Sequence, residues 1–285
     1  MTSRTRSALA ALGGAVLATA AVGATVAPAQ GAAWAPADTA TIHPGVQMYT
    51  DGAQCTGNFV FTDGAGDVYV GYAAHCAGTG GATETGCDSG WLPLGTKVDF
   101  VEGGSLASAG ESVGTGTLVY SSWLAMQKAG TTDANACDHN DFALVRVDAE
   151  NVGDVNPSIP FWGGPMGIDT DGTQAGETVY SYGSSSLRAG IELLSPKQGT
   201  SLGTSGEGWS HPVYTATPGV PGDSGSAFLD AEGNALGTLS TLAIAPLAGS
   251  NGVGDLAHEL EFAQAHSGIG GLALALGTEP FSPVI

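Results

Sequence analysis

The sequence Pro221-Gly222-Asp223-Ser224-Gly225-Ser226 decides how this chain of 285 residues is interpreted. It places a serine hydroxyl two residues after Gly222, and a glycine leaves its backbone N–H open to approach by developing negative charge. A serine hydroxyl is a weak nucleophile until a neighbouring base takes its proton. The stretch therefore indicates chemistry only if the chain also supplies a histidine and a carboxylate.

Both groups occur upstream of the serine. His75 stands in Ala73-Ala74-His75-Cys76, after the β-rich stretch 67–72, and Asp141 opens the apolar run 142–147. Taken singly, these motifs could be a packed histidine, a strand-leading turn residue and a tight glycine hairpin. Taken together, the order His75, Asp141, Ser224 is that of a chymotrypsin-type triad rather than that of α/β-hydrolases or subtilisins. We therefore predict His75 as the general base, Asp141 as the group that orients it, and Ser224 as the nucleophile.

With these motifs the chain resembles the chymotrypsin/trypsin-like family of secreted serine proteases, over about residues 45 to 255. The resemblance implies an all-β fold of two antiparallel six-stranded β-barrels with a C-terminal helix. It also implies an oxyanion hole formed by the backbone N–H groups of Gly222 and Ser224. The substrate pocket that it implies includes Thr217, Pro218, Ser240 and Leu242, and Leu242, where the family has a glycine, would narrow that pocket.

The expected organisation follows from composition and from this resemblance. Arg4 and Arg6, an apolar run and Ala27-Pro28-Ala29 are typical of a secretory signal peptide. The expected segments are a signal peptide (1–29), a short N-terminal extension (30–44), a first barrel (45–150), a linker (151–174), a second barrel (175–254), and a C-terminal helix and tail (255–285). Strands of the second barrel are predicted at 177–182, 190–194, 211–215, 226–229 and 235–241. The tail beyond 270 is compatible with a strand or with an extended helix contact.

The charge of the chain restricts its partners. All 27 acidic residues but only five lysines and arginines lie beyond residue 29, and the whole chain has a formal charge of −20. A surface of this sign repels nucleic acid and anionic lipid. We expect a secreted, extracellular monomer that acts on a protein or peptide substrate, with no nucleic-acid or membrane partner.

Four cysteines in an exported chain suggest two disulfides, for which three connectivities are formally possible. The resemblance selects Cys55–Cys76 and leaves Cys87–Cys137 as the second bridge. The sequence predicts no metal site and no cofactor. The run His258–Phe262 lacks the second histidine of a zinc helix, and we expect it to be exposed on the surface.

Asp223 has no obvious partner, because the Ile-Val-Gly-Gly sequence that supplies a new N-terminus in animal members of the family is absent. Since a buried, unpaired carboxylate is costly, another cation must neutralise it, and Arg188 is the best candidate. The prediction is an enzyme that is active without zymogen cleavage.

The function predicted is that of a serine endopeptidase, a hydrolase that forms an acyl-enzyme intermediate. Residues 217–220 contain no carboxylate, so we expect cleavage after small or medium apolar residues rather than after lysine or arginine. The alternative is a protease-like extracellular binding module that is catalytically weak or inactive.

Overall fold

The structure is a computed structural model that describes residues 33–79, 85–242 and 249–283. The predicted signal peptide, 1–29, and the start of the predicted extension lie outside the described residues. No helix in the described part of the chain is long and apolar enough to cross a membrane.

The first half of the fold is an antiparallel sheet of eight strands in the order β14-β3-β4-β7-β6-β5-β1-β2. Its strands are β1 (Gln47–Thr50), β2 (Ala53–Thr56), β3 (Val60–Thr62), β4 (Val68–Tyr72), β5 (Lys97–Glu102), β6 (Glu111–Ser121), β7 (Ala143–Val147) and β14 (Ala273–Leu274). Buried aliphatic and aromatic side chains, among them Met48, Val70, Phe100 and Val145, pack into one core cluster of this sheet.

The prediction of a six-stranded first barrel is therefore replaced by an eight-stranded sheet. One additional strand, β2, follows β1 through Asp51 and Gly52, which both have positive φ, as a tight two-residue hairpin requires. The other is β14, which comes from the C-terminal tail and pairs with β3. Of the two alternatives for the tail, a strand is found, and it consists of residues 273–274.

The second half forms a closed six-stranded barrel in the order β10-β13-β12-β11-β8-β9, as predicted. Its strands are β8 (Ala175–Tyr182), β9 (Pro196–Leu202), β10 (Ser210–Thr215), β11 (Ala227–Leu229), β12 (Ala235–Leu242) and β13 (Asn251–Asp255). Six buried apolar side chains fill its interior: Val179, Val213, Phe228, Leu236, Leu239 and Val253.

One predicted strand of this barrel is wrong. Residues 190–194 lie in a turn and a short 3₁₀ helix, η4 (Glu192–Leu194), and Leu193 is 89% exposed. The strand is β9, which begins later and buries Lys197 and Ser201 instead of an apolar row. A polar strand of this kind has no hydrophobic alternation by which sequence could find it.

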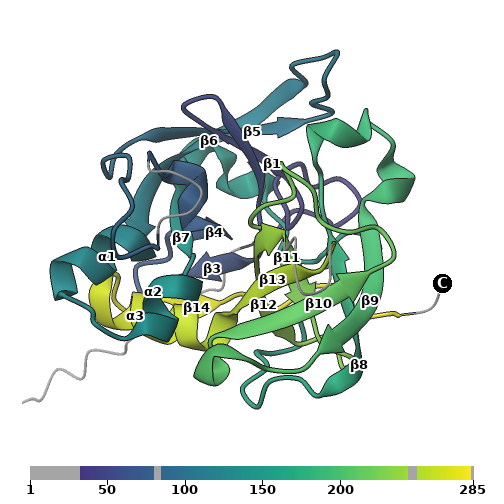
Figure 1. Ribbon diagram of the computed structural model, residues 1–285. Helices are drawn as coiled ribbons and strands as arrows, with labels where there is room; N and C mark the ends of the chain where they lie inside the picture. The colour runs from purple at the N-terminus through teal and green to yellow at the C-terminus, as the bar shows by residue number, and fades with distance from the viewer. Residues whose placement is uncertain (1–32, 80–84, 243–248, 284–285) are drawn as a thin grey trace, which may run out of the picture. The chain divides into compact units, whose positions relative to one another are not determined.

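Three α-helices occur in the described residues: α1 (Ser122–Ala129), α2 (Ala134–His139) and α3 (Leu256–His266). The short 3₁₀ helices are η1 (Ala74–Ala77), η2 (Ala149–Asp154), η3 (Ser186–Arg188), η4 and η5 (Gly206–Gly208). Helix α3 matches the predicted C-terminal helix, and the Asp255 side chain caps it by accepting from the His258 N–H. Figure 1 shows α1, α2 and α3 together on one side, where α3 contacts α1 and the barrel strands β12 and β13.

The disulfides are Cys55–Cys76 and Cys87–Cys137, and no free cysteine remains in the described residues. Both predicted pairings are confirmed. The first joins β2 to η1, which carries His75, and the second joins the segment after residue 84 to α2. Both bridges therefore restrain the segments that lead to the candidate histidine and aspartate.

Candidate active site

His75 and Asp141 meet because of the register between two strands. Tyr72, at the end of β4, pairs with Ala143, at the start of β7, so residues just beyond these positions lie next to each other. The Asp141 Oδ2 atom is 2.6 Å from His75 Nδ1, and Asp141 Oδ1 accepts from the His75 backbone N–H at 2.8 Å. Ser240 on β12 adds a third bond, from its Oγ to Asp141 Oδ2 at 2.6 Å. The aspartate is thus connected to both halves of the fold.

The electrostatics of this pair suit an imidazole that gains a proton during a reaction. Burial alone would lower the pKa of His75, but the charge of Asp141 and its hydrogen bond outweigh burial and raise the pKa above 6.5. Burial would raise the pKa of Asp141, but the His75 charge and the hydrogen bonds from His75 and Ser240 hold it below 3.8. The side chain of Asp141 is 6% exposed and that of His75 is 31% exposed, so the imidazole is the accessible member.

The turn that carries Ser224 is attached to both halves. The Ser224 carbonyl accepts from the Thr56 N–H at 2.8 Å, and the Gly225 N–H donates to Leu239 O at 2.7 Å. A Cβ at Gly225 would lie 2.9 Å from the backbone nitrogen of Ala73, two residues before His75, and the φ of Gly225 is +89°. Only glycine therefore allows the turn to approach the histidine segment this closely.

The preceding residues hold two backbone N–H groups in fixed orientations. Gly222 has a φ of +96°, and its carbonyl accepts from Thr56 Oγ1 at 2.7 Å and Gln54 Nε2 at 3.0 Å. The Ser185 hydroxyl donates to Pro221 O at 2.6 Å, which fixes the peptide that carries the Gly222 N–H. Within the described residues, neither the Gly222 nor the Ser224 N–H donates to a protein acceptor. Two uncommitted N–H groups next to a serine are what an oxyanion hole requires.

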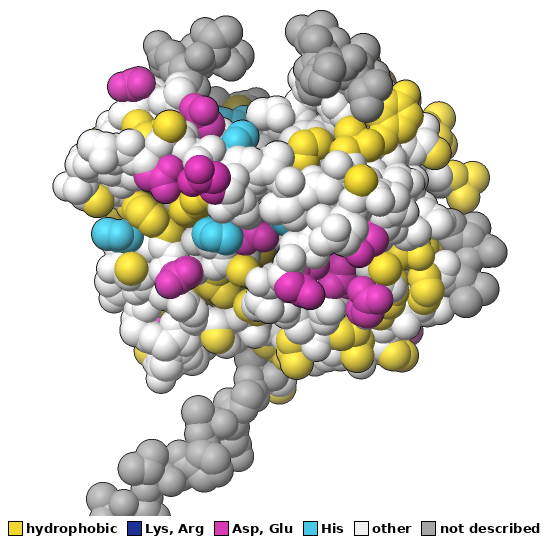
Figure 2. Space-filling model, turned by 60° about the horizontal axis from the view of Figure 1, so that its bottom comes forward, with side chains coloured by type: hydrophobic (Ala, Val, Ile, Leu, Met, Phe, Trp, Pro, Cys, Tyr) yellow, Lys and Arg dark blue, Asp and Glu magenta, His cyan; other side chains and the backbone are white. Residues whose placement is uncertain are grey.

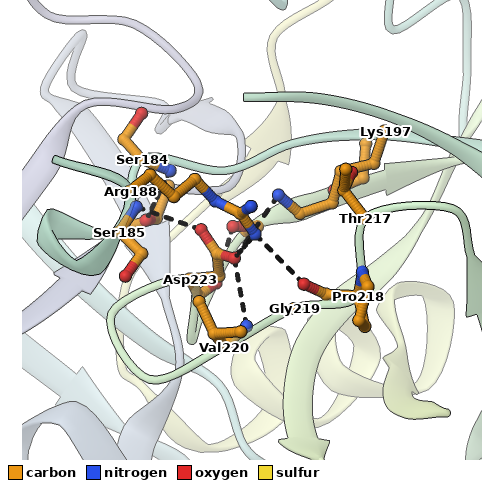
Figure 3. Close-up of polar contacts among 12 residues, drawn as sticks. Ser184, Ser185, Arg188, Lys197, Thr217, Pro218, Gly219, Val220 and Asp223 are labelled. Carbon is orange, nitrogen blue, oxygen red and sulfur yellow. Dashed lines mark hydrogen bonds and ion pairs between the residues drawn. The ribbon is translucent and has the colours of Figure 1, made fainter. Parts of the chain in front are cut away.

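Asp223, between these two residues, is fully buried and paired with Arg188, as predicted. Figure 3 shows the Arg188 guanidinium between the Asp223 carboxylate and the carbonyl of Pro218. The Arg188 Nη2 atom lies 2.5 Å from Asp223 Oδ2 and 3.1 Å from Pro218 O. The carboxylate also accepts from the N–H groups of Ser185 at 3.0 Å and Val220 at 3.1 Å. The Asp223 carboxylate therefore connects the segment before the serine turn to the segment that contains Ser185 and Arg188.

Sequence reasoning missed a second cation at this carboxylate. Lys197 on β9 is fully buried, and its Nζ lies 3.4 Å from Asp223 Oδ2. Gly183 leaves the space for this pair, because a Cβ there would lie 2.9 Å from Lys197 Nζ. Burial lowers the pKa of Lys197 to about 8, although the charge of Asp223 acts in the opposite direction. A single lysine in a polar strand gave no signal of this position.

The candidate substrate pocket contains a further residue that sequence reasoning missed. Asn251, at the start of β13 and 1% exposed, accepts from the Gly219 N–H at 2.7 Å and donates to Thr241 O at 3.1 Å. Its amide therefore joins the segment that contains Thr217 and Pro218 to the strand that contains Ser240. Leu242, which was predicted to narrow this pocket, is 47% exposed at the end of β12.

A cavity of about 240 Å³ opens beside Ser240 and Thr241 and is also lined by Asp138, His139 and Asn251. It provides concave space next to the residue that binds Asp141.

The surface of the protein is acidic. The face drawn in Figure 2 carries several Asp and Glu side chains, and no lysine or arginine of the described residues is visible on it.

One group of metal-binding side chains occurs within the described residues: Cys55, His75 and Cys76. The two sulfurs form a disulfide with each other, so neither offers the thiolate that binds a metal ion.

The comparisons with known proteins give a limited likeness. No family model matches the chain, and no curated protein matches its sequence. Among solved structures, protease A from Thermobifida fusca is 17% identical with a TM-score of 0.49, covering 83% of this chain and 99% of its own. A protease from Nocardiopsis is 17% identical with a TM-score of 0.48, covering 82% of this chain and 98% of its own. A chymotrypsin from Cellulomonas bogoriensis is 19% identical with a TM-score of 0.44, covering 77% and 94%. The chemistry assigned below rests on the residues of this chain.

Proposed function

We propose that this protein is a serine endopeptidase in which Ser224 is the nucleophile, His75 the general base and Asp141 the group that orients and stabilises His75. The observation that carries the proposal is the 2.6 Å contact between His75 Nδ1 and Asp141 Oδ2, made next to the segment against which the Ser224 turn packs. The hydrogen bond from Ser240 to Asp141 supports it, because it leaves Nδ1 facing a fixed carboxylate.

In the proposed reaction, His75 Nε2 takes the proton from Ser224 Oγ as that oxygen bonds to the carbonyl carbon of the peptide. The carbonyl oxygen becomes an oxyanion, which the N–H groups of Gly222 and Ser224 stabilise. Protonated His75 then gives its proton to the leaving nitrogen as the C–N bond breaks, which leaves an acyl-enzyme ester. Water repeats the sequence on the ester and restores the free serine.

Preference for small or medium apolar residues belongs to the same proposal. The pocket segment, Thr217 to Val220, offers no carboxylate to a basic side chain, and burying an unpaired ammonium group is strongly unfavourable. Asn251 supports the size limit, because its amide occupies the space between Gly219 and Thr241.

We further propose that the protein acts outside the cell, as a monomer, on protein or peptide substrates. The two disulfides support an oxidising location, and the predicted signal peptide accounts for export. The acidic surface disfavours nucleic acid and anionic membranes. A catalytically inactive binding module is not favoured, because the contacts of His75, Asp141 and Ser240 are all in place.

The experiment is covalent labelling with a fluorophosphonate followed by peptide mapping. The expected adduct lies on Ser224 in the folded protein, and it is absent from Ser224→Ala and from heat-denatured wild type. Ser186, a serine of η3 outside the triad, provides a control: Ser186→Ala should label like wild type. Wild-type protein that takes no label and hydrolyses no peptide would contradict the proposed function.

A further inference from the structure

Glu259 of α3 is fully buried, although the sequence predicted an exposed side chain in this run. Its Oε2 accepts from Thr238 Oγ1 on β12 at 2.6 Å, and its Oε1 accepts from the backbone N–H of Asp141 at 3.3 Å. The chain leaves room for this carboxyl: a Cβ at Gly254 would lie 3.1 Å from Glu259 Cδ and 3.0 Å from His139 O. A glycine at 254 therefore allows a glutamate to stand next to the candidate triad.

The contact matters because it completes the hydrogen bonds of the segment 140–142. The Asn140 carbonyl accepts from Ser122 Oγ, and the Phe142 N–H donates to the same hydroxyl. The Asp141 carbonyl accepts from the Ala74 N–H at 3.1 Å. The Asp141 N–H would have no partner in the described part of the chain without Glu259. Since buried N–H groups need acceptors, Glu259 determines how this peptide is held.

Glu259 also belongs to a polar chain that runs between the two halves of the fold. Asn58, which precedes β3 and is fully buried, donates from Nδ2 to Thr238 Oγ1 at 3.1 Å. Thr238 donates to Glu259, and Glu259 accepts from Asp141. The chain thus links the first sheet, the barrel and α3 to the residue that binds His75.

The charge state of Glu259 fits this position. Burial raises the pKa of Glu259 well above 4.5, and the neighbouring charges of Asp141 and Asp255 raise it further, against the hydrogen bonds from Thr238 and Asp141. A neutral carboxyl group can accept from Asp141 without placing a second anion beside its carboxylate.

We propose that Glu259 is a positioning residue for Asp141: it holds the backbone of the aspartate while His75 and Ser240 hold its carboxylate. The expected effect on turnover rests on the proposed function, whereas the contact between Glu259 and the Asp141 N–H does not depend on it. Loss of the Glu259 side chain would let the Asp141 peptide shift, and a shift of the carboxylate changes the orientation and pKa of His75. The substitution should therefore lower turnover more than substrate binding.

The test compares Glu259→Leu, Glu259→Ala and Glu259→Gln with Glu261→Leu, a matched change at an exposed glutamate of the same helix. Turnover per titrated active site, KM and the pH profile of kcat/KM are measured. Glu259→Leu and Glu259→Ala should lose at least about tenfold in kcat with little change in KM, and their apparent His75 pKa should move. Glu259→Gln keeps an oxygen that accepts from the Asp141 N–H and loses only the oxygen that accepts from Thr238 Oγ1, so it should stay within about threefold of wild type. Glu261→Leu should match wild type.

Counting only titrated sites removes the effect of misfolded protein. A Leu or Ala variant with wild-type kcat and pH profile would overturn the proposal, as would a Gln variant as impaired as the Leu variant. If the wild type hydrolyses no peptide, the proposed function fails. The positioning role of Glu259 can then still be tested by measuring the pKa of the His75 ring by NMR titration. An unchanged His75 pKa in Glu259→Ala would then refute the positioning role.

Discussion

Lys197 Nζ and Asp223 Oδ2 lie 3.4 Å apart, and neither side chain is exposed to solvent. Arg188 binds the same carboxylate oxygen, so one anion faces two cationic side chains. Burial lowers the pKa of Lys197, and the charge of Arg188 lowers it further, against the charge of Asp223. The cluster holds the residue that precedes Ser224 through side chains and backbone groups of the described residues.

The first prediction concerns the stability contributed by Lys197. Its folded pKa of about 8 lies below the ordinary value of 10.5, so the penalty for the buried charge is fully present below pH 8. As pH rises from about 8 to 10.5 the folded lysine loses its proton before the unfolded one does, and stability should rise. The slope is at most about 1.4 kcal/mol per pH unit for one proton. Urea unfolding of wild type and Lys197→Met across this range should show the rise in the wild type alone; parallel curves would contradict it.

The second prediction concerns Arg188. Removing one partner of a buried ion pair is expected to cost about 3–5 kcal/mol, so Arg188→Met should be strongly destabilised. Because Asp223 holds the N–H groups of Ser185 and Val220, the variant should also lose most of its turnover. The wild type should be active with extra residues fused ahead of its mature N-terminus. Activity that appears only after proteolytic release of a new N-terminus would refute this account.

The third prediction concerns the imidazole. Since the pKa of His75 is raised above 6.5, kcat/KM should rise with pH through an apparent pKa above that value. Protonated His75 also stabilises the folded state at pH values below 6.5, and this contribution should be lost as pH rises through the folded pKa.

Asp141→Asn should lower kcat by about four powers of ten and Ser240→Ala by about threefold to tenfold. Steady-state assays over about pH 5–9 measure the pH profile of kcat/KM and the loss of kcat in the two variants. Urea unfolding over the same range measures the stability contributed by His75. A profile of kcat/KM that is independent of pH would exclude His75 as the base.

The fourth prediction concerns the pocket. Asn251→Ala should open the space between Gly219 and Thr241 and raise kcat/KM for a leucine substrate relative to an alanine substrate by at least about tenfold. Leu242→Gly is the comparison, because its side chain is the one that sequence suggested as the limit. A shift in Leu242→Gly with none in Asn251→Ala would reverse the assignment. Dominant cleavage after lysine or arginine in the wild type would contradict the specificity proposed.

Helix α3 could be predicted from the sequence because the residues that define it are close in the chain, and it is found where it was expected. The partners of the two disulfides and of the Arg188–Asp223 pair are distant in sequence. The disulfide pairings were expected from the family resemblance, and Arg188 from the need to neutralise a buried carboxylate; the structure contains all three contacts. The pairing of His75 with Asp141 depends on a register of two strands, yet each strand is apolar enough to be predicted from its own residues.

The sequence was misleading where polar side chains are buried. Strand β9 buries Lys197 and Ser201 without an apolar row, so no pattern marks its buried side. Helix α3 buries Glu259 on the same face as Leu256, Leu260 and Ala263, so a charged residue lies within its apolar face. Their positions depend on Asp223 and Asp141, which are distant in sequence. Strand β14 has two residues, too few for any periodic signal. Such features follow from tertiary contacts and could not be predicted from one sequence.

Strand β14 has a consequence for how the protein is made. The strand next to β3, which belongs to the N-terminal half of the fold, is supplied by residues 273–274. Translation delivers the chain from its N-terminus, at about 5–20 residues per second. The edge of β3 therefore has no partner on this side until residues 273–274 have been synthesised, after every strand of the barrel. The first sheet, whose strand β4 leads to His75, is thus completed only after the whole barrel and the segment that carries Ser224 have been made.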